Sequence, residues 1–485
     1  MSDKMSVSGY EAVIGLEVHV ELRTGRKIFC TCPASFGAEP NTQVCPTCLG
    51  MPGALPVLDE TAVEYAVRAG LALNCAIQRT SWFDRKNYFY PDLPKGYQIT
   101  QNDCPICLGG FVPIETEAGK KQIRLTRIHM EEDAGKLIHR GDVTEIDCNR
   151  CGVPLIEIVS EPDMRTPDEA KAYLNSLRRI LLYIGVSDCR MNEGSLRCDV
   201  NVSMRPRGSA EFGVKCEIKN LNSVNYVGRA LEYEIARQAK ILSEGGVIES
   251  ETRRYNEDRG ITEKMRKKET TVDYRYFAEP NLPPLCLSEE YIAGIRGQMP
   301  KMPEERVEEL CGTYGLRRDT AEQLVQTPRL AQYFEDCAAH TDYKVICANL
   351  FVGEILPVVG EECAEIYLDP AAVGAVSTLL GDGKIVSGNA KRLLHLTKER
   401  GGDPKTIAEK ERMIKITDES VLLPVVREAL AANEKVLADI RRGKLSAKKQ
   451  LMGHVMRATS GGADPILTEQ LIDRVVEEAL REEEF

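Results

Sequence analysis

The stretch Val13-Ile-Gly-Leu-Glu-Val-His-Val-Glu-Leu22 alternates apolar and polar side chains. Successive side chains of a β-strand point to opposite faces, so the run predicts a strand with Glu17, His19 and Glu21 on one face. Two acids around an imidazole are typical of a metal or acid–base site on a rigid support. A half-exposed strand whose polar side only faces water would show the same pattern.

The same alternation recurs in three later segments, residues 127–133, 153–161 and 195–203. The first ends in the carboxylates of Glu131, Glu132 and Asp133, the second presents Glu157, and the third presents Asp199. Several strands with acids on one face predict a sheet whose concave side is a charged site. Oxygen ligands with a single imidazole favour Mg²⁺ or Mn²⁺ there.

The composition is that of a large globular protein. The chain has 485 residues, 43% hydrophobic and 28% charged, with a formal net charge of −11. This length predicts two to four domains. The N-terminus lacks the apolar core of a signal peptide, and no run approaches the roughly 18 apolar residues of a membrane span. Seventeen cysteines, an odd number, indicate reduced thiols and metal sites. We therefore expect a cytoplasmic protein without a membrane role.

Cysteine spacing predicts a separate metal site. Twelve residues separate the pair Cys30/Cys32 from the pair Cys45/Cys48, and two thiolates from each pair would fill the tetrahedral shell of one Zn²⁺. A filled shell leaves no position for water, so we expect this zinc to stabilise the fold. Four unrelated buried thiols are the alternative. Two further pairs would form another site if their loops meet: Cys104 with Cys107, and Cys148 with Cys151.

Phosphate binding in this chain needs cations other than those of a P-loop. The sequence contains no Gly-Lys-Ser or Gly-Lys-Thr, which excludes the phosphate loop of P-loop enzymes. Lys86 is one candidate, because Tyr88 and Tyr90 beside it suit stacking on a nucleotide or a terminal base. Arg127 and Arg197, which lie in the acidic strand segments, are further candidates for ATP phosphates. A packed aromatic loop with solvated charges is the alternative.

Six motifs resemble, in the same order, those of the B subunit of the bacterial aspartyl/glutamyl-tRNA(Asn/Gln) amidotransferases. They are residues 13–22, 84–91, 129–136, 154–162, 193–201 and 273–277. The resemblance runs from about residue 10 to the end of the chain. One departure is Ala278, where the family usually has proline after its Asp-Tyr-Arg-Tyr-Phe motif. The paired cysteines occur in only some members, so zinc is predicted from spacing alone.

The resemblance implies a carbon–nitrogen ligase with glutamine as the amido donor. In that family the B subunit uses ATP to phosphorylate the side-chain carboxylate of Glu-tRNA(Gln) or Asp-tRNA(Asn). Ammonia released by a partner amidase then displaces the phosphate. The implied partners are the amidase, which is the A subunit, and a small C subunit in a heterotrimer, together with misacylated tRNA. Whether Glu-tRNA, Asp-tRNA or both are substrates stays open.

Phosphoryl transfer to a carboxylate needs a divalent cation to neutralise the phosphates and the incoming acid. By resemblance, the metal-binding positions of the family fall on Glu17, His19, Glu131, Glu132, Glu157 and Asp199. Of these, Glu17, His19, Glu132 and Glu157 are the expected catalytic residues. The chain has no amidase-type loop rich in serine and glycine, so ammonia is expected from the partner.

The hydrophobic period changes along the chain and predicts three domains of an α+β protein. Residues 1–293 carry all strand motifs and 13 of the cysteines. The resemblance implies that they form a cradle-like catalytic domain, with a mixed or antiparallel sheet. Residues 294–410 have helical period and form an all-helical domain. Residues 411–485 form a small helical tail, in which Asp464 caps a last helix with Pro465 at its first position.

The tail contains a basic segment although the chain as a whole is acidic. Residues 441–457 hold six cations and no acid, which favours contacts with tRNA phosphates. The residues expected to make them are Arg441, Arg442, Lys448 and Lys449. A solvated helix face is the alternative for this segment. For the whole chain, the alternative to a ligase component is a zinc-stabilised RNA-binding protein whose carboxylates are structural.

Overall fold

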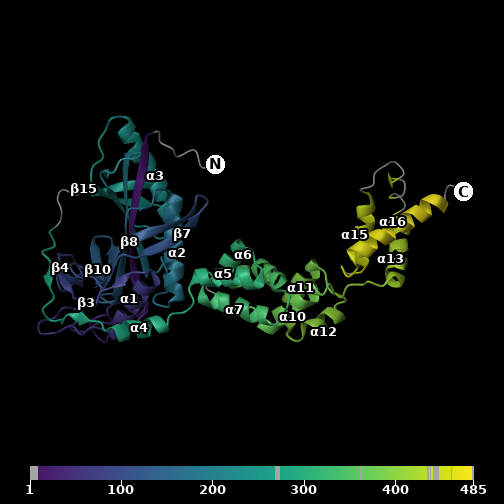
Figure 1. Ribbon diagram of the computed structural model, residues 1–485, viewed down its shortest axis with the longest axis horizontal. Coiled ribbons are helices and arrows are strands. Elements are labelled where there is room, and N and C mark those ends of the chain that lie inside the picture. Colours follow the sequence, from purple (N-terminus) through teal and green to yellow (C-terminus); the bar gives the residue numbers. More distant parts are fainter. Residues whose placement is uncertain are drawn as a thin grey trace. The chain divides into compact units, whose positions relative to one another are not determined.

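The computed structural model describes residues 9–267, 273–360, 363, 365–433, 436, 439–440, 447–459 and 461–482. They form two compact units that divide between Met302 and Pro303. The first unit contains a mixed sheet with helices and the second is helical (Figure 1), so the expected α+β class with a helical C-terminal region is confirmed. The domain boundaries at 293 and 410 stay predictions. No helix in the described ranges is long and apolar enough to cross a membrane.

The main sheet of the first unit joins strands that lie far apart in the sequence. Its strands follow the order β15 (Ile261–Lys267), β14 (Glu251–Asn256), β13 (Cys216–Lys219), β12 (Leu196–Pro206), β1 (Tyr10–Glu21), β11 (Pro154–Ser160), β8 (Gly119–Glu132), β5 (Tyr97–Thr100), β4 (Asp84–Asn87) and β16 (Phe277–Ala278). Three strands attach beside this path, namely β2 (Ala76–Ile77), β6 (Cys107–Leu108) and β7 (Phe111–Thr116). The strands β13 and β14 run parallel, and the other pairs are antiparallel.

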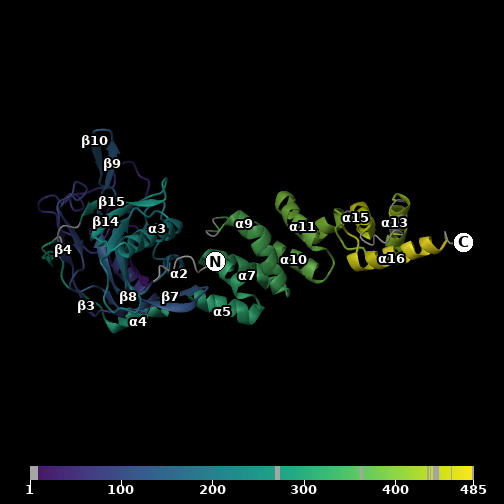
Figure 2. The same cartoon turned by 90° about the horizontal axis from the view of Figure 1, so that it is seen from above.

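Two small sheets complete the strand content of the described part of the first unit. The strands β9 (Lys136–Arg140) and β10 (Val143–Asp147) form an antiparallel hairpin, which projects from the body of the unit in Figure 2. The strands β3 (Thr80–Ser81) and β17 (Leu285–Cys286) pair with each other. The second pairing ties the end of this unit to a segment near its start.

Strand β1 has the two faces that its sequence predicts. Leu16, Val18 and Val20 are at most 1% exposed and belong to the hydrophobic core. Glu17 and His19 lie on the opposite face and are partly exposed. The neighbouring strands β11 and β12 pair with β1 on either side, so the polar face of β1 continues across the sheet.

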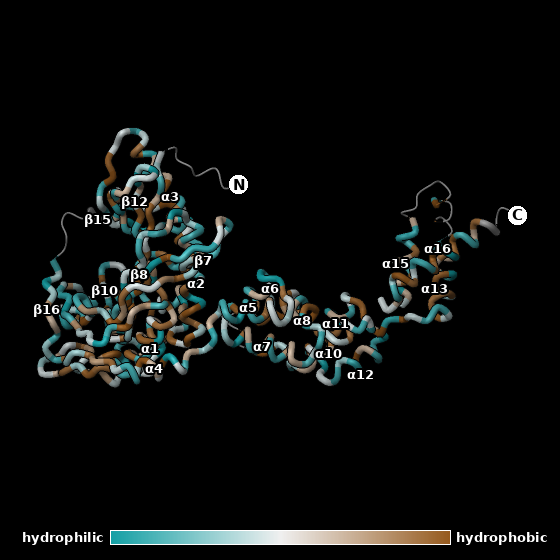
Figure 3. Tube along the Cα trace, in the orientation of Figure 1, coloured by the Kyte–Doolittle hydropathy of each residue, from teal (hydrophilic) through white to brown (hydrophobic). Residues whose placement is uncertain are grey.

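Helices cover the apolar side of the sheet. The first unit contains α1 (Glu60–Ala72), α2 (Pro167–Tyr183), α3 (Val224–Ser243) and α4 (Glu289–Gly297). Thr166 begins α2, because its side chain accepts a hydrogen bond from the amide of Glu169 and Pro167 occupies the first turn. Helices α2 and α3 contact each other, and α3 packs on β12 and β15. Hydrophobic segments run through the centre of this unit and hydrophilic ones mostly lie outside (Figure 3).

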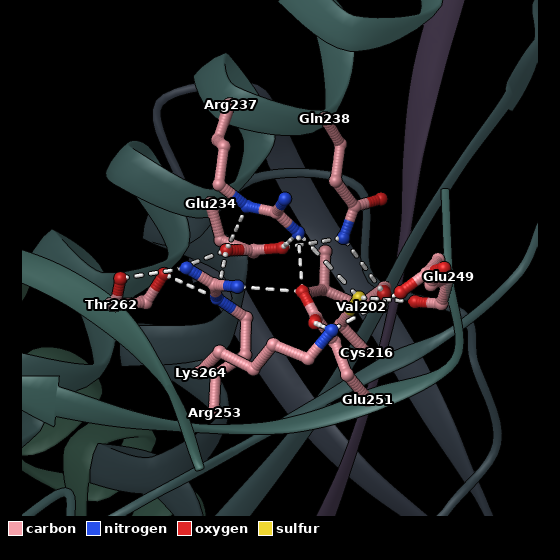
Figure 4. Close-up of polar contacts among 10 residues, drawn as sticks. All are labelled: Val202, Cys216, Glu234, Arg237, Gln238, Glu249, Glu251, Arg253, Thr262 and Lys264. Carbon is pink, nitrogen blue, oxygen red and sulfur yellow. Dashed lines mark hydrogen bonds and ion pairs between the residues drawn. The ribbon is translucent and has the colours of Figure 1, made fainter. Parts of the chain in front are cut away.

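A buried group of ion pairs fastens α3 to strands β14 and β15 (Figure 4). We call Glu234, Arg237, Glu251 and Arg253 the paired-charge network. The Arg237 Nη2 atom lies 2.6 Å from Oε1 of Glu234, and the Arg253 Nη1 atom lies 2.6 Å from Oε1 of Glu251. Arg253 Nε also lies 3.3 Å from Oε2 of Glu234. Each acid therefore has a guanidinium partner, which offsets the cost of burying it.

Where the structure describes it, the second unit is built from helices. They are α5 (Pro303–Tyr314), α6 (Arg318–Leu324), α7 (Pro328–Ala339), α8 (Lys344–Leu350), the π-helical turn η2 (Phe351–Ile355), α9 (Leu356–Val359), α10 (Pro370–Gly381), α11 (Ser387–Arg400), α12 (Pro404–Lys410), α13 (Glu419–Ala431), α15 (Lys448–Ala458) and α16 (Pro465–Glu482). The predicted start of the last helix is confirmed, because the Asp464 carboxylate accepts from the amide of Leu467 at 2.8 Å. Helices α13, α15 and α16 share a hydrophobic core.

Candidate active site

A row of side chains crosses four neighbouring strands of the main sheet. In register order the row is His129 (β8), Glu157 (β11), His19 (β1) and Arg197 (β12). Side chains directly opposite each other on one face of a sheet are close enough to interact. The structure therefore brings together residues from four segments that the sequence presented separately. We call the side of the sheet that carries this row the acidic face.

Two glutamates and two histidines meet on the acidic face. The Nε2 atom of His19 lies 3.4 Å from Oε2 of Glu157 and 3.6 Å from Oε1 of Glu131. The Nε2 atom of His129 lies 3.3 Å from the same Glu157 oxygen and 3.7 Å from Oε2 of Glu131. Ligand atoms of His19, Glu131 and Glu157 all lie within 4.8 Å of one another. This spacing suits a shared divalent cation.

In this group, carboxylates stabilise positive charge on the neighbouring imidazoles. Burial opposes protonation of His19, but the hydrogen bond and charge of Glu157, with the charge of Glu131, raise its pKa to about 9. Burial alone would raise the pKa of Glu157, yet its contacts with His129 and His19 hold that pKa well below the usual range. The two acids therefore favour a cation beside them, whether a proton on imidazole or a metal ion.

A second acidic group lies next to the first on the same face. Glu17 of β1 is opposite Asp199 of β12, and ligand atoms of these two residues and Glu217 of β13 lie within 4.8 Å of one another. Lys219 forms ion pairs with Asp199 and Glu217. Burial and the charge of Glu157 raise the pKa of Glu17. The five acids of the two groups thus concentrate negative charge at one place.

Glu132 lies away from this cluster, although the resemblance placed it with Glu131 among the metal ligands. Neighbouring residues of a strand point to opposite faces, so the Glu132 side chain lies on the other side of β8. There it pairs with Lys95 and accepts a hydrogen bond from the amide of Ile99 at 2.9 Å. Glu132, Lys95 and Cys48 line a cavity of about 230 Å³. The structure does not bring Glu132 together with the other predicted metal ligands.

The three predicted phosphate-binding cations have different surroundings. Arg197 Nη2 lies 2.7 Å from the Asp133 carboxylate, and Arg127 Nη1 donates to the carbonyl of Asn102 at 3.1 Å. Among the described residues, no carboxylate lies within 4.0 Å of the Lys86 ammonium. Burial disfavours its charge, but Glu131 and then other groups, Glu157 among them, raise the pKa of Lys86. Lys86 therefore carries a positive charge at the edge of the acidic face.

The predicted zinc ligands come together in the structure. Ligand atoms of Cys30, Cys32, Cys45 and Cys48 lie within 4.8 Å of one another. A hydrogen bond from Cys30 lowers the pKa of Cys48 to about 4, helped by the charge of the buried Lys27. The four thiols fit a tetrahedral zinc ion.

The two other cysteine pairs do not form a group of metal ligands in the described part of the chain. Cys104 Sγ contacts the carbonyl of Thr80, and Cys151 Sγ contacts the carbonyl of Asp92.

Two family models match parts of this chain. Residues 12–293 match the GatB/GatE catalytic domain, and residues 332–476 match the GatB domain. The chain belongs to the GatB family. All strands of the acidic face lie within the match to the catalytic domain, except for the first two residues of β1.

Similar curated proteins cover nearly the whole chain. The B subunit of the aspartyl/glutamyl-tRNA(Asn/Gln) amidotransferase of Caldanaerobacter subterraneus subsp. tengcongensis is 51% identical over 467 residues, which span 96% of this chain and 98% of the relative. The protein of the same name from Thermoanaerobacter pseudethanolicus is 50% identical over the same shares. That from Caldicellulosiruptor saccharolyticus is 48% identical over 97% of this chain and 99% of its own.

Sequence reasoning missed two residues of this GatB-family site. His129 precedes Glu131 by two positions, so the strand period that grouped Glu17 with His19 would also have placed His129 on the acidic face. Glu217 lies in the short strand β13, where it alternates with the buried Cys216 and Ile218. Four residues gave too short a pattern to separate a strand from a loop.

The predicted tRNA contacts are only partly placed. Arg441 and Arg442 lie outside the described residues. On α15, Lys448 forms an ion pair with Asp473 of α16 at 2.6 Å, whereas Lys449 is exposed. In the first unit, Tyr88 lies near Lys86 and contacts the ring of Tyr274, while Tyr90 is 54% exposed.

Proposed function

We propose that the chain is the B subunit of a tRNA-dependent amidotransferase. In this proposal it uses ATP to phosphorylate the side-chain carboxylate of Glu-tRNA(Gln), Asp-tRNA(Asn) or both, and ammonia then forms the amide. The observation that carries the proposal is the acidic face, which lies inside the domain shared with relatives named for this activity. A phosphoryl transfer between two anionic substrates needs such a place for cations.

Mg²⁺ or Mn²⁺ fits the acidic face. His19, Glu131 and Glu157 would hold one cation, and Glu17 with Asp199 would contribute to a neighbouring position, because each set of ligand atoms is compact and partly exposed. Bound divalent cations would neutralise the ATP phosphates and the carboxylate that attacks them. Glu132 is proposed to act from its own pocket with Lys95, since its side chain lies across the strand.

The chain's own cations would orient the phosphates. Lys86 has no carboxylate partner within 4.0 Å among the described residues, so its ammonium is available to an incoming phosphate. Arg197 ends the row of His129, Glu157 and His19, and Arg127 lies two positions before His129 on β8, so both would act near Lys86. Such fixed positive groups contribute most where negative charge develops during transfer.

The cysteine group is proposed to hold structural Zn²⁺. Four thiolates complete a tetrahedral shell and leave no open position, so this metal would fix the loops that carry Cys30 and Cys48 rather than take part in the reaction. The cavity that contains Glu132 borders the same loops.

The proposed partners are misacylated tRNA and two further proteins, in a cytoplasmic heterotrimer. The first protein is an amidase, the A subunit, which supplies ammonia, and the second is a small C subunit. The tail is proposed to bind tRNA through exposed cations such as Lys449, and its contribution would be affinity rather than chemistry.

The test is whether carboxylate activation depends on the aminoacylated tRNA. The full complex would be given ATP, Mg²⁺ and either Glu-tRNA(Gln) or Asp-tRNA(Asn), with ADP release and amide formation measured separately. Ammonium chloride replaces glutamine in one arm, so that a failed amidase does not mask the activity of this chain. Both tRNAs without attached amino acid serve as controls. ADP release at the control rate with both charged tRNAs would favour the RNA-binding alternative.

A further inference from the structure

An aromatic cluster of three tyrosines, Tyr88, Tyr274 and Tyr276, lies beside the acidic face. The sequence predicted a ligand contact for Tyr88, and the other two have no role in the function proposed so far. The rings of Tyr88 and Tyr274 have centroids 6.0 Å apart, and those of Tyr274 and Tyr276 are 5.8 Å apart, both edge to face. The Lys86 ammonium lies 5.0 Å from the centroid of the Tyr274 ring. The ring of Tyr274 therefore packs between those of Tyr88 and Tyr276, and the Tyr276 side is open to solvent, with 38% of that residue exposed.

The segment that carries two of these rings is fixed to the sheet. The backbone amide of Asn87 donates to the carbonyl of Tyr274 at 2.9 Å, and its side-chain amide donates to the carbonyl of Arg275 at 2.7 Å. Two residues later β16 pairs with β4, and the buried Glu279 binds Arg85 through two contacts of 2.5 and 3.0 Å. The tyrosines are therefore held in place before a ligand arrives.

The backbone between the two tyrosines is strained. Arg275 has a φ of +48°, in the left-handed region that residues with a side chain seldom adopt. The side chain of Asp273 accepts a hydrogen bond from the Arg275 amide at 2.9 Å, which helps to hold this conformation. Residues in this conformation cluster at active sites and ligand-binding sites when the surrounding structure holds them there.

The cluster combines the two contacts that a nucleotide needs. An exposed aromatic ring offers a surface for stacking a base, and a lysine without a carboxylate partner offers a contact for phosphate. Both lie near the acids, because only β5 separates β4, which carries Lys86, from β8, which carries Glu131, and β16, which follows Tyr276, pairs with β4. Burial lowers the pKa of Lys86, but the charges of Glu131 and Glu157 are among those that raise it. A purely structural aromatic cluster would not require a charged group at its exposed edge.

We propose that Tyr276, supported by Tyr274 and Tyr88, stacks on the adenine ring of an adenosine ligand whose phosphate is held by Lys86. This inference rests on the proposed function, in which both substrates carry such a group. One is ATP, and the other is the 3′-terminal adenosine of the tRNA that bears the amino acid. The shared chemistry is an adenine base joined through ribose to phosphate, placed beside the divalent cations.

The experiment compares Tyr276→Leu with Tyr276→Phe in the full-length chain. Leucine removes the stacking ring, and phenylalanine keeps it. Tyr276 is partly exposed, so neither change should unfold the protein. Phe212→Leu is the matched control, because Phe212 is an exposed aromatic residue in the same unit, 64% accessible, after β12. Tyr274→Leu is the second variant, since it removes the support of the Tyr276 ring.

Four probes separate the two sources of adenosine. They are ATP with Mg²⁺, inorganic tripolyphosphate with Mg²⁺, an RNA minihelix that ends in cytidine-cytidine-adenosine, and the same minihelix without its last adenosine. Loss of one base–aromatic stack should weaken binding by about 5- to 100-fold. If the ring holds ATP, Tyr276→Leu weakens ATP but not tripolyphosphate. If it holds the tRNA end, the loss appears only with the complete minihelix.

Tyr276→Phe and Phe212→Leu should bind every probe as the wild-type chain does. The inference would be overturned if Tyr276→Leu and Tyr274→Leu bound all four probes as tightly as the wild-type chain, with normal wild-type binding. The proposed function would still stand. A wild-type chain that binds neither ATP nor the complete minihelix would overturn the proposed function and this inference with it.

Discussion

The two charged clusters of the first unit lie on opposite sides of the same sheet and differ in how their charges are balanced. In the paired-charge network, Glu234 and Glu251 each contact a guanidinium group. On the acidic face, five carboxylates of the two groups share Lys219 and two histidines within the described part of the chain. Buried acids that the chain itself neutralises belong to the fold, because removing one partner of such a pair is strongly destabilising, whereas acids left in excess indicate that a cation from outside completes the site.

Glu157→Gln should have the largest effect, and it acts on chemistry rather than on stability. We expect carboxylate activation to fall at least a thousandfold, about 4 kcal/mol of transition-state stabilisation. Binding of tRNA should be nearly unchanged, because phosphate contacts and charge neutralisation are separate tasks. ADP release at saturating tRNA measures carboxylate activation, and filter binding measures tRNA affinity. Normal ADP release by the variant would remove Glu157 from the site.

Glu234→Ala should show the opposite behaviour. It leaves Arg237 and Arg253 with one acid fewer in a buried position, which costs about 3 kcal/mol or more of folding stability. The thermal transition of the first unit should shift down, while activation per folded molecule should hardly change. Glu244→Ala, on the exposed end of the same helix region, is the control. A stable variant with lost activity would reverse the assignment of the two clusters.

Cys45→Ser tests whether the cysteine group stabilises the fold, as the paired-charge network does, rather than serving the chemistry. We expect about one zinc ion per wild-type chain and at least a hundredfold weaker zinc binding in the variant, about 2.7 kcal/mol. Thermal stability should fall with the metal, because ligand geometry and folding are coupled. Metal analysis of freshly purified, reduced protein gives the answer, with Cys286→Ser as control because Cys286 is exposed and outside the group. Absence of zinc in the wild-type protein would contradict the prediction.

The dependence of folding stability on pH should distinguish the two clusters. The His19 imidazole on the acidic face titrates near pH 9, whereas the guanidinium groups of the paired-charge network do not. The pKa of His19 is raised from 6.5 to about 9. Its stabilising contribution is therefore complete below pH 6.5 and is lost as the pH rises through 9. Without divalent metal we expect stability to fall by on the order of 1 kcal/mol between pH 7 and 9. In His19→Gln this slope should flatten.

The affinity for divalent cations should change with pH in the opposite direction to the stability contribution of His19. Binding displaces the imidazole proton, so the affinity for Mn²⁺ should rise over that pH range. Calorimetric titrations at pH 7 and 9 would measure it. Equal Mn²⁺ affinity at both values would show that His19 is not a ligand.

Lys449→Gln should have the smallest effect, and it extends the comparison to the tail. Lys448 is already paired with Asp473, whereas Lys449 is exposed. Loss of one phosphate contact should weaken tRNA binding a few-fold and reduce the slope of log affinity against log salt by about 0.9. Lys448→Gln should change the slope less. Equal slopes for wild type and Lys449→Gln would assign this helix to another role.

Local periodicity was enough to determine the longer strands and their faces. The same period places Glu132 and Glu131 on opposite faces of β8, which their grouping as metal ligands overlooked. The alternation around Glu17 and His19 placed the polar residues of β1 correctly, because the two-residue period is a property of the strand itself. The same holds for the cap of α16, where Asp464 and Pro465 act within one turn. The spacing of the cysteine pairs also put all four thiols close together, since each pair needs only a short loop.

Only the tertiary structure decided which faces meet. The sequence order of β1, β8, β11 and β12 does not reveal that they lie side by side, and long-range pairing is what sets His129, Glu157 and His19 in one row. Long-range packing also brought Tyr274 to Lys86 from 188 positions away in the chain. Period is fixed by the local backbone, but the partner of a strand is fixed by the packing of the whole unit, which no short segment contains.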